Sequence, residues 1–105
     1  MANLLHYMKD RHGYIYIMTN AGNSTLYVGA TSELPGRVWQ HKEKANPKSF
    51  TARYNLTKLV YYEVADNVVA AYEREQQIKA GSRKKKETLI ESINPTWKDL
   101  SDELG

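Results

Sequence analysis

The chain has 105 residues, of which 41% are hydrophobic and 26% are charged, and its formal net charge is +3. This length suits one domain with one modest core, and the composition is typical of a soluble globular protein rather than a disordered one. The absence of cysteine excludes a disulfide framework and a thiolate metal site, and it agrees with a cytoplasmic location. No apolar run approaches the roughly 18 residues that a membrane helix needs.

Six elements are predicted in chain order after a loosely ordered N-terminal lead-in over residues 1–12. Runs of β-branched and aromatic residues predict strands, and capping residues followed by periodic apolar positions predict helices. The strands are expected over 14–19, 25–30 and 58–65, and the helices over 32–44, 67–81 and 82–93. The order β-β-α-β-α-α predicts a single α+β domain over 13–105, with a three-stranded, mostly antiparallel sheet flanked by helices.

The first two strands place tyrosines on one face of the sheet and aliphatic side chains on the other, because side chains alternate along a strand. We expect Tyr16 to lie opposite Tyr27, since this register gathers the aliphatic residues of both strands on one face. The same register places Gly29 opposite Tyr14 and leaves bare backbone on the tyrosine face, a common sign that another backbone or a ligand approaches closely. Tyrosines paired on a sheet are more often packing residues than catalytic ones, so the hairpin alone leaves both interpretations open.

The stretch "GRVWQHKEK", residues 36–44, places Arg37 and His41 four residues apart, so both project from one face of the expected helix. Arginine binds phosphate oxygens with a planar fork, and histidine exchanges a proton near neutral pH, so the pair suits phosphate chemistry. An ordinary exposed pair is the alternative for this feature taken alone. Val38 and Trp39 are expected to pack toward the sheet.

An acidic residue interrupts the apolar stripe of the helix expected over 67–81. The stripe consists of Val68, Ala71, Tyr72, Glu75, Ile78 and Ser82. Burying the Glu75 carboxylate costs several kcal/mol unless a cation compensates its charge. A metal ion and an ion pair with Lys79, four residues further on, explain this position equally well. Glu73 falls on the polar side of the helix and is the lesser candidate.

The charge of the chain is distributed unevenly. Residues 37–58 hold six Lys or Arg and one acid, residues 79–86 hold five Lys or Arg and no acid, and residues 87–105 hold five acids and one base. A basic middle suits a polyanionic partner such as nucleic acid. The alternative for the run "RKKK" by itself is a solvated helix face.

Together these features resemble the GIY-YIG nuclease superfamily, in its small stand-alone bacterial form. The resemblance rests on "YIY" at 14–16, ten intervening residues, "YVG" at 27–29, and then an arginine, a histidine and a helix glutamate in order. It continues through "RVWQHK", "KLVYYE", "REQQIKAGSRKKKETLIES" and "NPTWKDL", and so covers nearly all of the chain after residue 13. It implies a three-stranded antiparallel sheet flanked by helices.

The resemblance also implies a role for each of five residues. Tyr16 corresponds to the tyrosine of the first motif, the general base, and Tyr27 to the tyrosine of the second motif, which helps to hold the nucleophile or phosphate. Arg37 and His41 correspond to the family's helix pair, in which the arginine binds the phosphate and the histidine orients Tyr16 or receives its proton. Glu75 corresponds to the metal-binding glutamate.

Three other positions bear on the comparison. Tyr14 stands where the first motif has its glycine, although Gly13 directly precedes it. Ala30 stands where many relatives carry a polar or basic residue that assists catalysis. A later polar position of the family corresponds loosely to Asn94.

The resemblance implies a metal-dependent DNA endonuclease in which Glu75 holds one divalent ion, Mg²⁺ or Mn²⁺. Since no separate module that selects a base sequence is evident, we expect the enzyme to recognise DNA shape, such as branched, flap or damaged forms. The first alternative is a nucleic-acid-binding module that keeps the fold and does not cleave. The second is a protein-interaction domain that uses its acidic tail as the contact surface.

Overall fold

The computed structural model describes residues 12–104. Its elements, in chain order, are β1 (Gly13–Thr19), β2 (Leu26–Thr31), α2 (Leu34–Lys42), α3 (Phe50–Arg53), β3 (Lys58–Ala65), α4 (Val68–Ala80), α5 (Arg83–Ile93) and the 3₁₀ helix η1 (Ser101–Leu104). The predicted order of three strands and three long helices is confirmed, and α3 and η1 are additional. Of the lead-in predicted over 1–12, only His12 lies among the described residues.

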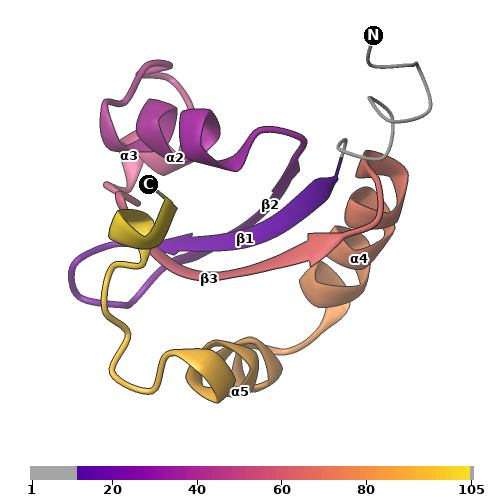
Figure 1. Cartoon of the computed structure of the whole chain (residues 1–105). Coiled ribbons are helices and arrows are strands. Elements are labelled where there is room, and N and C mark those ends of the chain that lie inside the picture. The colour runs from indigo at the N-terminus through magenta and orange to yellow at the C-terminus, as the bar shows by residue number, and fades with distance from the viewer. Residues whose placement is uncertain (1–11, 105) are drawn as a thin grey trace, which may run out of the picture.

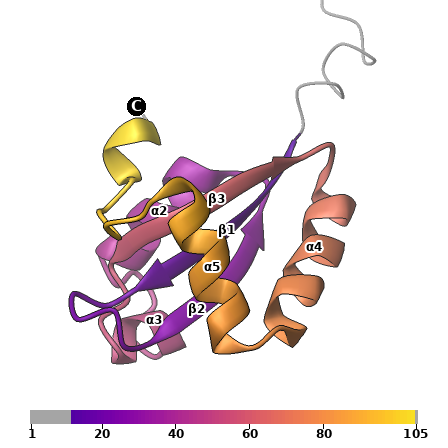
Figure 2. The same ribbon diagram turned by 90° about the horizontal axis from the view of Figure 1, so that it is seen from below.

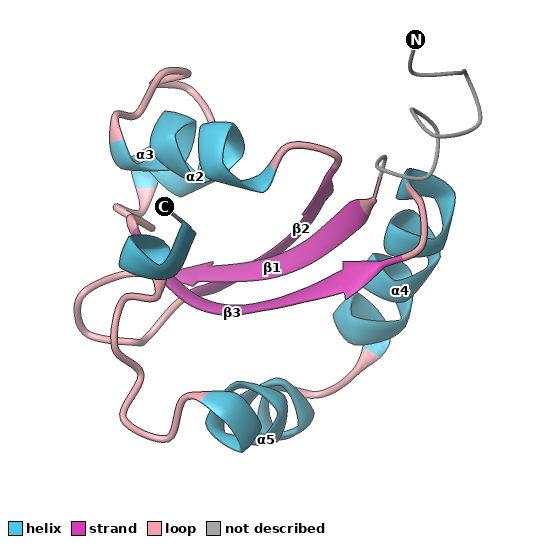
Figure 3. Ribbon diagram, in the orientation of Figure 1, coloured by secondary structure: helices cyan, strands magenta, loops and turns pink. Residues whose placement is uncertain are grey.

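The three strands form an antiparallel sheet in the order β2-β1-β3, so the first strand is central (Figures 1 and 3). Helices α2 and α3 lie over one face (Figure 1), and α5 crosses the other, as the view from below shows (Figure 2). The predicted α+β fold with a three-stranded sheet is therefore confirmed.

Each face of the sheet has its own core, as the alternation of side chains predicted. On one face Ile15, Ile17 and Val28 pack with side chains of α4 and α5. On the other face Tyr16 and Met18 pack with a second set of buried residues, which consists of Leu34, Val38, Leu56, Leu59 and Leu100. The tyrosine face is thus a packed face, and any site on it must lie where the covering helices leave an opening.

The predicted register of the hairpin is wrong by two residues. Tyr16 lies opposite Gly29, and Tyr27 lies opposite Met18. The loop sets this register: the Asn20 side chain accepts hydrogen bonds from the backbone N–H groups of Ser24 and Thr25, at 2.9 and 3.1 Å. Because a slip of two keeps every side chain on its own face, the predicted faces remain correct.

Two details of helix α2 also differ from expectation. Its N-cap is Glu33, whose side chain accepts a hydrogen bond from Gly36 N at 2.8 Å, and not Ser32. Val38 is buried as predicted, but Trp39 is 60% exposed, because the helix turns its next position toward solvent. The caps of the later helices, Asn67 and Ser82, are confirmed.

The acidic end of the chain folds back onto the domain. Asp99 forms an ion pair with Lys42 of α2 and accepts a hydrogen bond from Leu59 N of β3 at 3.2 Å. Tyr62 donates a hydrogen bond to Glu103 at 3.3 Å. At least two of the tail acids therefore hold the C-terminal segment in place. Among residues 12–104, no helix is both long enough and apolar enough to cross a membrane.

Candidate active site

A glycine in β2 sets the position of the central tyrosine. The ring of Tyr16 lies across Gly29, so closely that a Cβ at that position would be 2.5 Å from both the Cζ and the hydroxyl oxygen of the tyrosine. Real Cβ contacts are never this short, so only glycine allows the phenol to lie against the β2 backbone. The prediction for Gly29 is wrong in its partner, because Gly29 lies opposite Tyr16 and not Tyr14, and the group that approaches it closely is the Tyr16 phenol.

Helix α2 brings a histidine to this phenol. The Tyr16 hydroxyl and His41 Nε2 are 2.9 Å apart. Tyr27 lies beside both, with its ring centroid 6.2 Å from that of Tyr16 and 5.7 Å from that of His41. The structure therefore brings these three predicted residues together, although Tyr16 and Tyr27 are diagonal neighbours and not direct partners.

A residue that sequence reasoning missed holds the other side of the imidazole. His41 Nδ1 is 2.8 Å from Thr51 Oγ1, and Thr51 is buried in the short helix α3. The Thr51 hydroxyl is in turn 3.2 Å from the hydroxyl of Ser49, the N-cap of α3. The only local signal was Ser49, whose residue type is favoured at helix N-caps.

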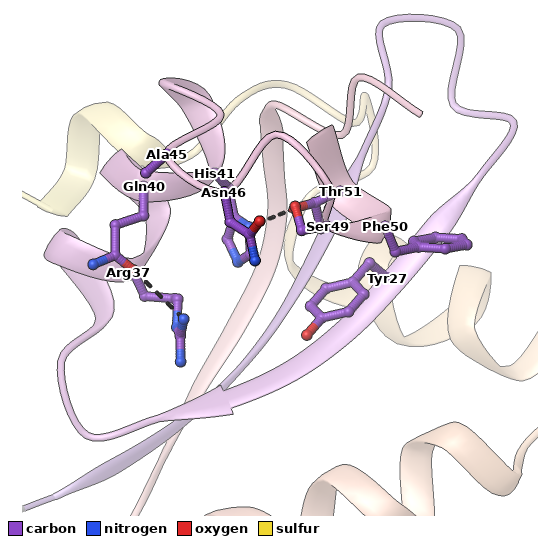
Figure 4. A pocket seen from close by; sticks show the side chains of 9 residues that line it. All are labelled: Tyr27, Arg37, Gln40, His41, Ala45, Asn46, Ser49, Phe50 and Thr51. Atoms are coloured by element: carbon purple, nitrogen blue, oxygen red, sulfur yellow. Dashed lines mark hydrogen bonds between the residues drawn. The ribbon is translucent and has the colours of Figure 1, made fainter. Parts of the chain in front are cut away.

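A pocket of about 430 Å³ opens beside this cluster (Figure 4). Tyr27, Arg37, His41, Phe50 and Thr51 are among the residues that line it. Arg37 is exposed, and among residues 12–104 its guanidinium bonds only the Gln40 side chain, at 3.4 Å. The pocket thus combines a cation, a phenol and an imidazole, which is the chemistry needed to receive a phosphate.

Burial makes the tyrosine and the histidine neutral. It raises the pKa of Tyr16, and the nearby Tyr27 phenol and Glu75 carboxylate raise it further, while Arg37 opposes the shift. Burial and the positive charge of Arg37 lower the pKa of His41 to about 4. At neutral pH a protonated phenol therefore faces a neutral imidazole. The hydroxyls of Tyr16 and Thr51 can each donate or accept, so the two contacts fit both tautomers of the neutral imidazole; in one of them Tyr16 donates to Nε2 and Nδ1–H donates to Thr51.

Glu75 is largely buried, as its place in the apolar stripe predicted, with 12% of its side chain exposed. Its Oε1 lies 3.6 Å from Lys79 Nζ and accepts a hydrogen bond from Gln76 at 3.1 Å. The ion pair, one of the two explanations left open for this position, is therefore present. Glu73 is exposed, as expected of the lesser candidate.

The Glu75 carboxylate suits only a metal ion that takes few ligands from the protein. Glu75 does not line the pocket of Arg37 and His41, but its charge is close enough to act on the Tyr16 phenol. Within residues 12–104, no group of three or more His, Asp or Glu could hold an ion. A single carboxylate suits Mg²⁺, which keeps several waters and binds through one or two carboxylates together with phosphate oxygens.

Three further positions that the sequence comparison singled out, Tyr14, Ala30 and Asn94, lie outside the pocket. Tyr14 packs beside the core of the tyrosine face, and Ala30 packs on the opposite face, where it pairs with Ile15. Asn94 is completely buried and caps α5; its amide donates to Val60 O and Lys98 O, at 3.1 and 2.8 Å. Asn94 therefore ties the C-terminal segment to β3.

Comparisons with known proteins agree with this arrangement. The GIY-YIG catalytic domain matches residues 12–88. A UPF0213 protein of Haloquadratum walsbyi is 36% identical over 84 residues, which are 80% of this chain and 91% of the relative. UPF0213 proteins of Natronomonas pharaonis and Clostridium perfringens are 38% and 35% identical, over 73% and 88% of this chain and 88% and 97% of their own. No solved structure is significantly similar. The chain belongs to the GIY-YIG family, with the small UPF0213 proteins as its relatives.

Proposed function

We propose that the protein is a metal-dependent DNA endonuclease that hydrolyses phosphodiester bonds and recognises the shape of its substrate. The observation that carries the proposal is the 2.9 Å contact between the Tyr16 hydroxyl and His41 Nε2, beside a pocket that Tyr27 and Arg37 line. A phosphate in that pocket would lie against a cation and next to a chain of proton-transferring groups. Membership in a nuclease superfamily supports the same conclusion.

The proton path begins at Tyr16. Because this phenol is protonated, it acts as a base by passing its own proton to His41 Nε2 while it accepts one from the attacking water. In the tautomer that the proposal requires, Nδ1–H donates to Thr51, which leaves Nε2 unprotonated and directed at the phenol. Tyr27, which lines the pocket, orients the water or a phosphate oxygen.

Arg37 binds a non-bridging phosphate oxygen. Its guanidinium is exposed at the pocket, and the 3.4 Å contact with Gln40 uses only one of its nitrogens, so other N–H groups remain available. Its charge therefore attracts the substrate and stabilises the negative charge that develops on the phosphate in the transition state.

Glu75 is the proposed metal ligand, and Mg²⁺ or Mn²⁺ the ion. Nucleases of this family generally depend on a divalent metal. The ion would polarise the phosphate and neutralise charge on the leaving oxygen. In its absence Lys79 compensates the carboxylate, which accounts for the ion pair at 3.6 Å.

The test is a cleavage panel of single-stranded, duplex and branched DNA with Mg²⁺ or Mn²⁺. Glu75→Gln is expected to abolish nicking and to leave DNA binding intact. Glu73→Gln, an exposed position on the same helix, is the matched control and should cleave normally. Tyr16→Phe is expected to slow nicking by at least about a hundredfold, the usual contribution of acid–base catalysis. Equal nicking by the Glu75 and Glu73 variants would refute the proposal.

The second candidate function is a nucleic-acid-binding module without cleavage. It is favoured by the Glu75–Lys79 ion pair, which satisfies the carboxylate without any metal. Salt-sensitive DNA binding with no nicking by the wild-type protein under any metal condition would establish this candidate. Either function agrees with the cytoplasmic location that the cysteine-free sequence suggests.

A further inference from the structure

A second hollow adjoins the candidate active site. Its volume is about 500 Å³, and it lies between β2 and the helices α4 and α5. Leu26 and Val28 give it an apolar floor, and Lys79 and Lys86 lie at its helical side. Tyr27 and Phe50 line this hollow as well as the first pocket, so the two rings form the ridge between them. Figure 4 shows both rings at the end of the first pocket that is remote from Arg37.

The ridge belongs to a row of aromatic rings. Phe50 stacks on Tyr27 with ring centroids 6.3 Å apart and planes 30° apart, and its centroid is 4.7 Å from that of Tyr54. Phe50 and Tyr54 are each 48% exposed. Single exposed hydrophobic residues are common, but here the half-exposed ring of Phe50 lines two charged hollows and is joined to a second half-exposed ring, Tyr54, which suggests a binding surface.

The surroundings of the row are basic. Residues 44–62 contain Lys44, Lys48, Arg53 and Lys58 and no acid. The Arg53 guanidinium lies 6.0 Å from the centroid of the Tyr54 ring. Across the second hollow, Lys86 is held in place because it donates to Gly81 O at 2.9 Å, while Lys79 contacts Glu75 only at 3.6 Å. This charge suits a polyanion that also carries flat apolar groups.

We propose that the aromatic row of Tyr27, Phe50 and Tyr54 stacks an unpaired base of a DNA strand, next to the phosphate bound at Arg37. The inference rests on the proposed function and names the substrate class of that site. The hollow beyond the ridge receives the neighbouring nucleotide, with its backbone toward Lys79 and Lys86. A pocket of this size holds one nucleotide, and the π-face of any base can stack on phenylalanine. Bases inside a duplex stay stacked on one another, so the substrate must present an unpaired base.

The test is binding without cleavage. Fluorescence anisotropy in EDTA compares a labelled oligothymidine of about 12 nucleotides, an abasic oligomer of the same length and charge, and a duplex. The wild-type protein should bind the oligothymidine at least tenfold more tightly than the abasic oligomer. Phe50→Leu keeps an apolar side chain without the ring; it should remove this difference and leave binding of the abasic oligomer unchanged.

Two control variants distinguish stacking on the Phe50 ring from the loss of any exposed aromatic ring. Phe50→Trp should keep the preference for bases, and Trp39→Ala, which removes a more exposed ring outside both hollows, should have no effect. Equal binding of the oligothymidine by the Phe50→Leu and wild-type proteins would overturn the proposal, as would binding of an oligouridine without binding of the oligothymidine. Because the assay needs neither metal nor cleavage, it tests base stacking separately from nuclease activity. Either proposal can therefore fail while the other holds.

Discussion

The close contact between Gly29 and Tyr16 makes Gly29→Ala a sharp test of how the site is built. The new methyl group would lie 2.5 Å from the phenol carbon and oxygen of Tyr16. Ordinary contact requires about 3.5 Å, so the ring must move by about 1 Å. A shift of that size takes the hydroxyl out of reach of His41 Nε2, from which it is now 2.9 Å away.

The energetic cost follows from two opposing effects. Overpacking a well-packed region costs about 1–3 kcal/mol. Replacing a strand glycine by alanine gains about 0.5–1 kcal/mol, because the unfolded chain loses freedom. The net loss is about 1–2 kcal/mol, or roughly 4–8 °C in melting temperature for a domain of this size. If the proposed proton path is correct, nicking should fall about a hundredfold, as for the loss of the phenol itself.

The measurements are thermal unfolding and nicking, with two controls. Gly22→Ala adds a methyl group at a position that has no atom within 4 Å, so nicking should stay at the wild-type level and the melting temperature should not fall. In a Tyr16→Ala background, Gly29→Ala should become stabilising, because the ring it displaces is gone. If Gly29→Ala destabilises the protein equally with and without the Tyr16 ring, the contact is not the cause and the account of the site is wrong.

Three further predictions follow from the surroundings of the site. The pKa of His41 is about 4 in the folded protein, below its usual 6.5, so the unfolded chain binds a proton at this imidazole more readily. The free energy of unfolding should therefore fall by about 1–2 kcal/mol between pH 6.5 and 4. This part of the pH dependence should be absent from unfolding curves of the His41→Gln variant. Thr51→Val should slow nicking about tenfold, which corresponds to the loss of one hydrogen bond, while Thr51→Ser should keep the wild-type rate. If Thr51→Val nicks DNA as fast as the wild-type protein, Thr51 has no part in the reaction. Asn94→Leu should lower the free energy of unfolding in denaturant by about 3 kcal/mol, because it leaves buried backbone groups unpaired, and nicking by the folded variant should persist.

The sequence predicted the faces of the sheet better than its register. Alternation along each strand assigned Tyr16 and Ile17 to opposite sides, and a slip of two residues leaves that assignment intact. The register itself depends on the Asn20 side chain, which closes the loop by accepting two backbone hydrogen bonds. A carboxamide in a turn-rich segment has many possible partners, so the pattern of residues could not select this one.

The candidate site was only partly predictable, for a similar reason. Motif spacing identified Tyr16, Tyr27 and His41, and the structure brings them together. Thr51 could not be found, because it lies in a segment without hydrophobic periodicity and acts only through a tertiary contact ten residues away from His41. The aromatic row built on Phe50 was missed in the same way, since a four-residue helix leaves no periodic signal.

If the proposed nuclease function is correct, the neutral pair of Tyr16 and His41 would link phosphate binding to proton transfer in this pocket. In the free protein burial keeps the pKa of His41 low and the charge of Arg37 lowers it further, so the imidazole is a weak proton acceptor. A phosphate bound at Arg37 brings negative charge to the same place and offsets the contribution of Arg37, which makes Nε2 more basic. The substrate itself would therefore prepare His41 to take the proton of Tyr16. A water molecule that enters the empty pocket would meet the weaker base, and for this reason we expect the relay to operate only when a phosphate is in position.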